Sequence, residues 1–204
     1  MPGSLHDDKK IIRQSKHRFT HRMLRQKPLE FPGGQVRVAD TSNFPIATTV
    51  AAAHVIIKSH AVREIHWHPN GDEWSHFISG KFRVTIFASS ATARTFDYQA
   101  GDVMMVPMNY PHYIENVDDG PMEMLEMFRA PRFEDFSLHQ WMAQTPPIMV
   151  AEHLNLKGHN KEKFLKALNK DMVSVKPAFP RSKSVSDIEA KALELVKGMQ
   201  INGS

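Results

Sequence analysis

Two histidines and a glutamate lie close together in the stretch 63–80 and could bind a metal ion. His66 and His68 are separated by one residue in a segment typical of a β-strand, and alternate side chains of a strand leave the same face. The turn-forming residues 69–72 follow, and Glu73 then begins the returning strand near both imidazoles. Neutral imidazoles and a carboxylate are common ligands of divalent metals, so this stretch predicts a metal site.

A His-x-His pair alone is weak evidence, because imidazoles are also ordinary surface groups or hydrogen-bonded core groups. Two further features strengthen the prediction. Gly80 closes the strand where a hairpin needs a tight reversal. A second block, 101–107, leads to His112, which adds a third imidazole from a distant strand. We therefore expect one divalent metal ion to be bound by His66, His68, Glu73 and His112.

The elements that must position these residues are short strands. Segments rich in β-branched or alternating apolar residues recur at roughly 8–12-residue spacing, with turn residues between them. These segments are 36–38, 48–57, 81–88, 103–106, 112–116 and 122–128. The pattern is typical of an all-β barrel or sandwich.

Helical signals begin only after these strands. Ser137 and Gln140 have the spacing of a capping box, and Thr145 before a proline fits the N-cap of a second helix. A third short helix is expected over 160–168. The clearest helical pattern starts at Ser186 and presents an apolar stripe that must pack against the barrel or a neighbouring subunit. We divide the chain into a basic N-terminal arm (1–30), a barrel (31–157) and a helical C-terminal extension (158–204).

The composition excludes several classes of function. The 204 residues contain no cysteine, so neither disulfides nor thiolate metal sites can form. The net charge of +4 is not gathered in one basic stripe, and no nucleic-acid reader motif is present, so we expect no nucleic-acid partner. No apolar run resembles a signal peptide or a membrane span. A cytoplasmic protein without a membrane partner is expected, although a truncated N-terminus would leave secretion open.

The two histidine-containing blocks resemble the two motifs of the cupin family. The residues that match the first motif are His66, His68, Glu73 and Gly80. Those that match the second motif are Gly101, Pro107, His112 and Asn116. His60 and Asn109 stand where the family pattern has glycine, and Asn tolerates left-handed backbone better than His does. The resemblance implies an all-β, double-stranded β-helix barrel of the jelly-roll type.

Residues 31–156 are similar to the second cupin domain of bicupin oxalate decarboxylases, for example in REIHWHPNGDEW and SLHQWMAQTPP. The resemblance implies a manganese ion held by three imidazoles and one carboxylate, with two coordination positions left open. Iron, nickel or zinc could occupy the same ligands. The implied reaction converts oxalate to formate and carbon dioxide, with dioxygen as co-catalyst.

Arg63 matches the family's oxalate-binding cation, and a small dianion requires such a cation beside the metal. The alternative is a surface arginine. Strict alternation along a strand places Glu64, not Arg63, on the face of His66, so Arg63 must lie at a bulge or at the strand start to reach the metal.

Two glutamates are candidates for the acid that protonates the formyl carbon. Glu126 lies in the apolar strand MEMLEMF, where burial would raise its pKa, and it matches a glutamate near the metal of the family. Glu134 lies where the first domain of the bicupins carries a mobile lid with a glutamate. The loop here is shorter, and a plain surface pair formed by Glu134 and Asp135 is at least as good an interpretation.

Three alternatives to the decarboxylase stay open from the sequence. A metal cupin without a suitable acid would oxidise oxalate to carbon dioxide and hydrogen peroxide. A non-catalytic cupin would bind metal or assemble through its extensions. The chain could also be a fragment of a bicupin, which folds poorly alone. The family implies a homo-oligomer, and the helix expected after Ser186 is a candidate contact.

Overall fold

Strands form most of the protein, whose computed structural model describes residues 19–167. The strands are β1 (Leu29–Phe31), β2 (Gly34–Ala39), β3 (Ala51–Ile57), β4 (Val62–Trp67), β5 (Glu73–Ser79), β6 (Lys81–Ala88), β7 (Thr92–Gln99), β8 (Val103–Val106), β9 (His112–Asn116), β10 (Met122–Phe128) and β11 (Phe136–Ser137). A 3-10 helix, η1 (Met23–Arg25), precedes them. Three helices follow: α2 (Leu138–Gln144), α3 (Pro147–His153) and α4 (Gly158–Ala167).

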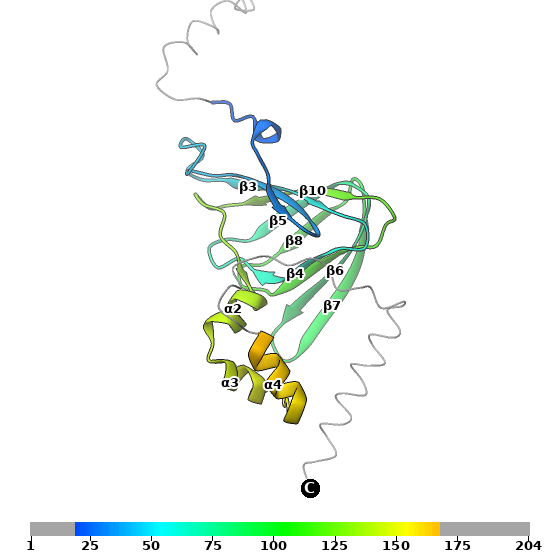
Figure 1. Ribbon diagram of the computed structural model, residues 1–204. Coiled ribbons are helices and arrows are strands. Elements are labelled where there is room, and N and C mark those ends of the chain that lie inside the picture. Colours follow the sequence, from blue (N-terminus) through cyan, green and yellow to red (C-terminus); the bar gives the residue numbers. More distant parts are fainter. Residues whose placement is uncertain (1–18, 168–204) are drawn as a thin grey trace, which may run out of the picture.

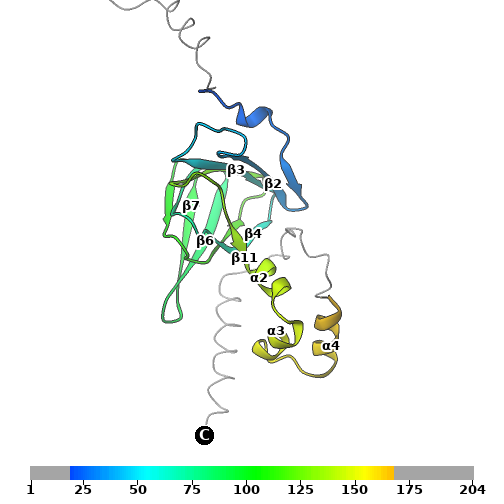
Figure 2. The same ribbon diagram turned by 90° about the vertical axis from the view of Figure 1, so that its left-hand side faces the viewer.

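The strands form two antiparallel sheets that face each other (Figures 1 and 2). One sheet has the order β1-β2-β3-β10-β5-β8, and the other has the order β11-β4-β9-β6-β7. The core lies between them, where Phe77 of β5 meets Phe82 of β6 with ring centroids 4.1 Å apart. This arrangement confirms the predicted all-β cupin barrel.

Every strand segment expected from the sequence overlaps an observed strand, but β7 was not among those segments. Seven of the eight β7 residues are exposed and only Tyr98 is partly buried, so the strand lacks the apolar alternation that reveals a half-buried strand. Its pairing with β6 runs over its full length, from Thr92 opposite Ala88 to Gln99 opposite Lys81. Backbone pairing with β6 therefore makes this segment a strand, although its sequence has no apolar alternation that would predict one.

The two positions that depart from the glycines of the family pattern keep the backbone that glycine favours. His60 has φ 56° and Asn109 has φ 65°, both in the left-handed region. Gly80 has φ 93°, and a Cβ atom there would lie 2.9 Å from the Cβ of Met122. The turns of the pattern are thus retained, at a conformational cost at His60 that glycine would not carry.

Helices α2, α3 and α4 gather at one side of the barrel, below the sheets in Figures 1 and 2. The predicted capping box is present, because the Ser137 side chain accepts from the Gln140 backbone and the Gln140 side chain accepts from the Ser137 backbone. The predicted N-cap at Thr145 is wrong: Thr145 caps the C-terminus of α2, and Pro146 is the N-cap of α3. Of the two consecutive prolines, Pro147 begins that helix.

Parts of the predicted domain division lie outside the described residues, including the helix expected after Ser186. Within the predicted arm, η1 and the start of β1 are formed. The boundaries at residues 30 and 157 stay predictions. No helix within residues 19–167 has the length and apolar character needed to cross a membrane.

Candidate metal centre and active site

Strand β4 and the residue after it position two of the four predicted ligands. His66 is in β4 and His68 follows the strand, and their side chains are buried, with 0% and 3% exposure. His112 begins β9 and lies directly opposite His66 in the pairing of β4 with β9. Glu73 begins β5 in the facing sheet and is 1% exposed. The two sheets therefore each contribute ligands to one enclosed position.

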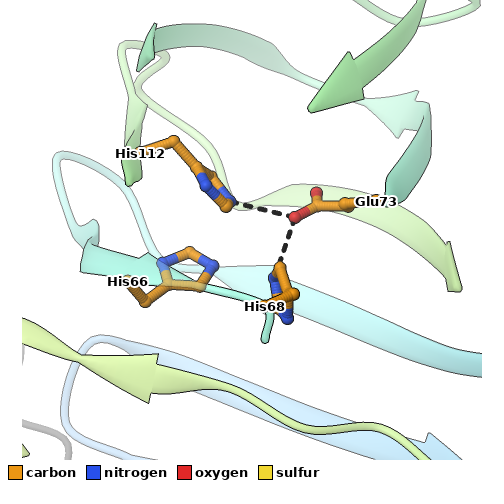
Figure 3. A group of neighbouring side chains, drawn as sticks. All are labelled: His66, His68, Glu73 and His112. Carbon is orange, nitrogen blue, oxygen red and sulfur yellow. Dashed lines mark hydrogen bonds and ion pairs between the residues drawn. The ribbon is translucent and has the colours of Figure 1, made fainter. Parts of the chain in front are cut away.

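The four side chains converge as the sequence predicts (Figure 3). One potential ligand atom from each residue lies within 4.8 Å of those from the other three. Glu73 Oε2 is 2.9 Å from His112 Nε2 and 3.0 Å from His68 Nε2. Ser75 donates a hydrogen bond of 2.6 Å to the other carboxylate oxygen, Glu73 Oε1. The carboxylate is thereby held with one oxygen directed at the imidazoles.

Backbone carbonyl oxygens select the tautomer of all three histidines. Nδ1 of His66 lies 2.7 Å from the oxygen of Glu64, Nδ1 of His68 lies 2.8 Å from that of Glu134, and Nδ1 of His112 lies 3.0 Å from that of Tyr110. A carbonyl oxygen can only accept, so each Nδ1 carries the proton. In a neutral ring the lone pair is then on Nε2, which is the arrangement that metal-binding histidines need.

The polar atoms at the centre of this group fit a bound cation. The buried Nε2 atoms of His66 and His68 have no hydrogen-bond partner within residues 19–167, since the 3.0 Å approach of His68 to Glu73 lacks hydrogen-bond geometry. Burial, reinforced by the charge of Arg63, holds the pKa of His66 well below its usual value, so this ring is neutral. Unpartnered lone pairs around a carboxylate favour a metal ion over an ordinary polar core.

The pKa of Glu73 is also consistent with a ligand. Burial alone would raise the pKa of this carboxyl, but the charge of His112 and the close approach of the His112 and His68 imidazoles outweigh burial. The pKa of Glu73 therefore lies well below its usual value, and the group is a carboxylate.

Glu126 of β10 is a second buried carboxyl in the barrel interior, with 0% exposure. Its backbone lies opposite Ser75 of β5, on the strand that carries Glu73. Neither of its oxygens has a hydrogen-bond partner within residues 19–167. Burial, and then the nearby charge of Glu73, raise the pKa of Glu126 well above its usual value, while Arg63 lowers it by less. Glu126 consequently keeps its proton to a higher pH than an ordinary carboxyl does, which suits a proton donor.

Arg63 is directed into the same interior because the pairing of β4 with β9 shifts register between Arg63 and His66. Arg63 pairs with Ile114 and His66 pairs with His112, so three steps along β4 match two steps along β9. This extra residue changes the alternation, and Arg63 is 9% exposed. Its Nη2 atom donates to Asp135 Oδ2. The sequence allowed Arg63 to turn inward at a bulge or at the strand start, and the register shift between Arg63 and His66 favours the bulge. The burial of Arg63 excludes the surface interpretation.

A sequence profile of the cupin family matches residues 21–162. The chain is a cupin. It is 48% identical over 160 residues to oxalate decarboxylase OxdC of Bacillus subtilis (strain 168). The matched region covers 76% of this chain and 41% of that relative. It is 46% identical over 125 residues to an oxalate decarboxylase of Arthroderma benhamiae, covering 61% of this chain and 29% of that one.

Solved structures of the Bacillus subtilis oxalate decarboxylase share this cupin's fold. The structure at pH 4.6 has a TM-score of 0.76 and 43% identity, and the match covers 89% of this chain and 46% of that one. A structure from work on its Mn(II) centres has a TM-score of 0.76 and 42% identity. That match covers 89% of this chain and 47% of the other chain. The cupin described here thus spans less than half the length of the relatives that it matches.

The loop after β10 differs from its sequence-based interpretation. Glu134 is exposed, and its backbone oxygen accepts a hydrogen bond from Nδ1 of His68. Asp135, which was its neighbour in a possible surface pair, forms the ion pair with Arg63. The sequence thus drew attention to Glu134 and gave no sign that Asp135 pairs with Arg63.

Other residues around this cupin's metal centre were also missed. Ser75 lies two residues after Glu73, so strand alternation could have revealed that both side chains share a face. The ring centroids of Phe128 and Phe133 lie 4.5 Å and 5.7 Å from that of His68. These rings form an apolar wall beside one ligand.

Proposed function

We propose that this cupin binds manganese and converts oxalate to formate and carbon dioxide. The observation that carries the proposal is the buried carboxyl of Glu126, which has no hydrogen-bond partner within residues 19–167 and a raised pKa, in the same interior as the three-histidine, one-carboxylate group. The similarity to oxalate decarboxylases supports the choice of substrate. The overall reaction consumes one proton, because the oxalate dianion and a proton yield formate and carbon dioxide.

His66, His68, Glu73 and His112 would hold the metal ion. When bound, manganese would supply positive charge for a substrate carboxylate and a one-electron redox couple at neutral pH. Oxygen and nitrogen ligands without thiolate suit manganese, although iron, nickel and zinc accept the same set. Dioxygen as co-catalyst stays a prediction from the family.

Arg63 would bind and orient the substrate. Arg63 lies in β4, three residues before His66; its guanidinium is buried and charged, and its buried Nε atom has no hydrogen-bond partner within residues 19–167. A carboxylate of oxalate would accept from this group through a charge-assisted hydrogen bond. The aromatic wall of Phe128 and Phe133 would limit water around the bound substrate.

Glu126 would supply the proton. After loss of carbon dioxide, the carbon that remains must receive a proton to become formate, and the donor must be near and shielded from water. The raised pKa of Glu126 keeps the proton on the carboxyl, as required of a general acid. Glu134 stays a candidate lid acid from the sequence alone, and its exposed side chain makes it the weaker choice.

Product analysis tests this function against its rivals. Manganese-loaded protein is incubated with oxalate, and formate and hydrogen peroxide are measured. Formate without peroxide supports decarboxylation, whereas peroxide with carbon dioxide would indicate an oxidase. Neither product would overturn both enzymatic functions and favour a non-catalytic cupin. The test must use this chain alone, because it spans only part of its relatives. A cytoplasmic location and a homo-oligomer also stay predictions.

A further inference from the structure

We infer that Asp135 is a positioning residue that holds the guanidinium of Arg63 toward the metal centre and directs its remaining N–H groups to a carboxylate ligand. The inference rests on the proposed function, in which Arg63 binds the substrate. Asp135 would act only through Arg63.

The contact between the two side chains uses only part of the guanidinium. Arg63 Nη2 donates to Asp135 Oδ2, while the Nε atom of Arg63 is buried and without a partner within residues 19–167. A buried N–H group without an acceptor is costly, so its presence indicates that a ligand completes the site. Asp135 thus binds one portion of the guanidinium and leaves another for a ligand.

Arg63 needs such an anchor, because its side chain has many rotatable bonds and leaves the strand at a bulge. The buried carboxyl of Glu126 is also near Arg63, but its raised pKa favours the protonated form, which cannot hold a guanidinium as a carboxylate does. Burial lowers the pKa of Arg63, and the charge of Asp135 contributes most to reversing that effect, so the pKa lies above its usual value. Asp135 is therefore the main counter-charge of Arg63.

Asp135 can serve as an anchor because its own backbone is fixed on both sides. On one side, the oxygen of Glu134 accepts the 2.8 Å hydrogen bond from His68 Nδ1. On the other side, Phe136 and Ser137 form β11, which pairs with Trp67 and His66 of β4. The segment that carries Asp135 is thus attached both to His68 and to the strand that carries His66 and Arg63. A carboxylate held in this frame fixes the guanidinium relative to the metal centre.

A double-mutant cycle tests this coupling. Oxalate affinity is measured by titration calorimetry under anaerobic conditions with manganese-loaded wild type, Asp135→Ala, Arg63→Ala and the double variant. Asp135→Ala should weaken oxalate binding about tenfold or more in the wild-type background and by less than about twofold when Arg63 is already alanine. Asp135→Asn, whose amide oxygen can still accept from Nη2, should restore part of the affinity. Equal losses in both backgrounds would overturn the inference, as would unchanged affinity in Asp135→Ala.

Controls separate positioning from a general structural effect. Asp119→Asn changes an acid whose side chain is fully exposed, in the connection between β9 and β10, and should leave affinity, manganese content and melting temperature at wild-type values. Manganese content is measured for every variant, and loss of affinity that follows loss of metal would contradict the inference. Asp135→Asn keeps the test valid if Asp135→Ala folds poorly.

A metal-free measurement keeps this inference distinguishable from the proposed function. In ¹⁵N-arginine spectra of metal-free protein, the Nε–H signal of Arg63 should exchange slowly with water. Asp135→Ala should accelerate that exchange about tenfold or more, whereas the surface control Asp119→Asn should not. Unchanged exchange in Asp135→Ala would overturn the positioning role whatever the protein does with oxalate. Faster exchange in a protein that binds no oxalate would support the positioning role and count against the proposed function.

Discussion

Glu73 and Glu126 lie on neighbouring strands of one sheet, are buried almost equally and have opposite acid–base properties. Their exposures are 1% and 0%. Glu73 accepts a hydrogen bond from Ser75 and lies 2.9 Å from His112 Nε2, and its pKa lies well below the usual value. Glu126 has no hydrogen-bond partner within residues 19–167, and its pKa lies well above the usual value.

The difference shows that neighbours, and not burial, assign the two roles. Burial disfavours the charged form of both carboxyls. At Glu73 the imidazoles and a hydroxyl supply positive charge and donors, so the carboxylate persists and can bind metal. At Glu126 the charge of Glu73 adds to the effect of burial, so the proton is retained. One interior thus contains a ligand and an acid, a separation typical of acid–base sites.

Removing the charge of Glu73 should abolish the metal centre. We expect Glu73→Gln to lower manganese affinity on the order of 100-fold or more, because the amide offers no negative charge to the ion. Activity on oxalate should fall below detection. Elemental analysis after dialysis measures bound manganese, with Glu134→Gln as the control. Full manganese occupancy in Glu73→Gln would remove this residue from the ligand set.

Removing the acidic proton of Glu126 should leave manganese binding unchanged and greatly slow the decarboxylation of oxalate. Glu126→Gln is nearly isosteric and cannot act as an acid, so formate production should fall about 10²- to 10⁴-fold. Manganese content should equal that of the wild type. Steady-state kinetics and elemental analysis are made on the same samples. Formate production at the wild-type rate would exclude Glu126 as the proton donor.

Replacing Arg63 should affect substrate binding more than turnover. Arg63→Lys keeps the positive charge but loses the planar set of donors, so KM for oxalate should rise about tenfold with a smaller change in kcat. Initial rates over a range of oxalate concentrations measure both constants. A wild-type KM would show that Arg63 does not contact the substrate.

The smallest expected effect concerns the stability of metal-free protein as a function of pH. The folded-state pKa of Glu126 is raised above the usual value of 4.5, so the folded protein binds this proton more tightly than the unfolded chain. That contribution is full below pH 4.5 and is lost as pH rises toward the raised pKa, at about 1 kcal/mol per pH unit.

Glu126→Gln removes this titration. The free energy of unfolding of the variant, measured with urea in the presence of a chelator between pH 5 and 8, should therefore fall less with rising pH than that of the wild type. Parallel pH dependences for the two proteins would show that the folded state does not raise the pKa of Glu126.

Much of the metal centre could be predicted from the sequence because its determinants are local. The two-residue period of a strand places His66 and His68 on one face, and a short turn returns Glu73 to them. Alternating apolar residues and turn residues likewise indicated most of the barrel, while the exposed strand β7 offered no such signal. The roles of the four ligands as metal binders stay a prediction, which elemental analysis can test.

Tertiary structure alone decided what surrounds the ligands. Local alternation assigned Arg63 to the wrong face, and only the pairing with β9 creates the bulge that turns it inward. Asp135 meets Arg63 across 72 residues of sequence, a contact that no local pattern contains. The sequence by itself determined which residue types form the ligand group, since spacing along a strand is a property of the backbone. The charge state of Glu126 and the partner of Arg63 depend on residues from other strands and loops, so the fold had to bring these together.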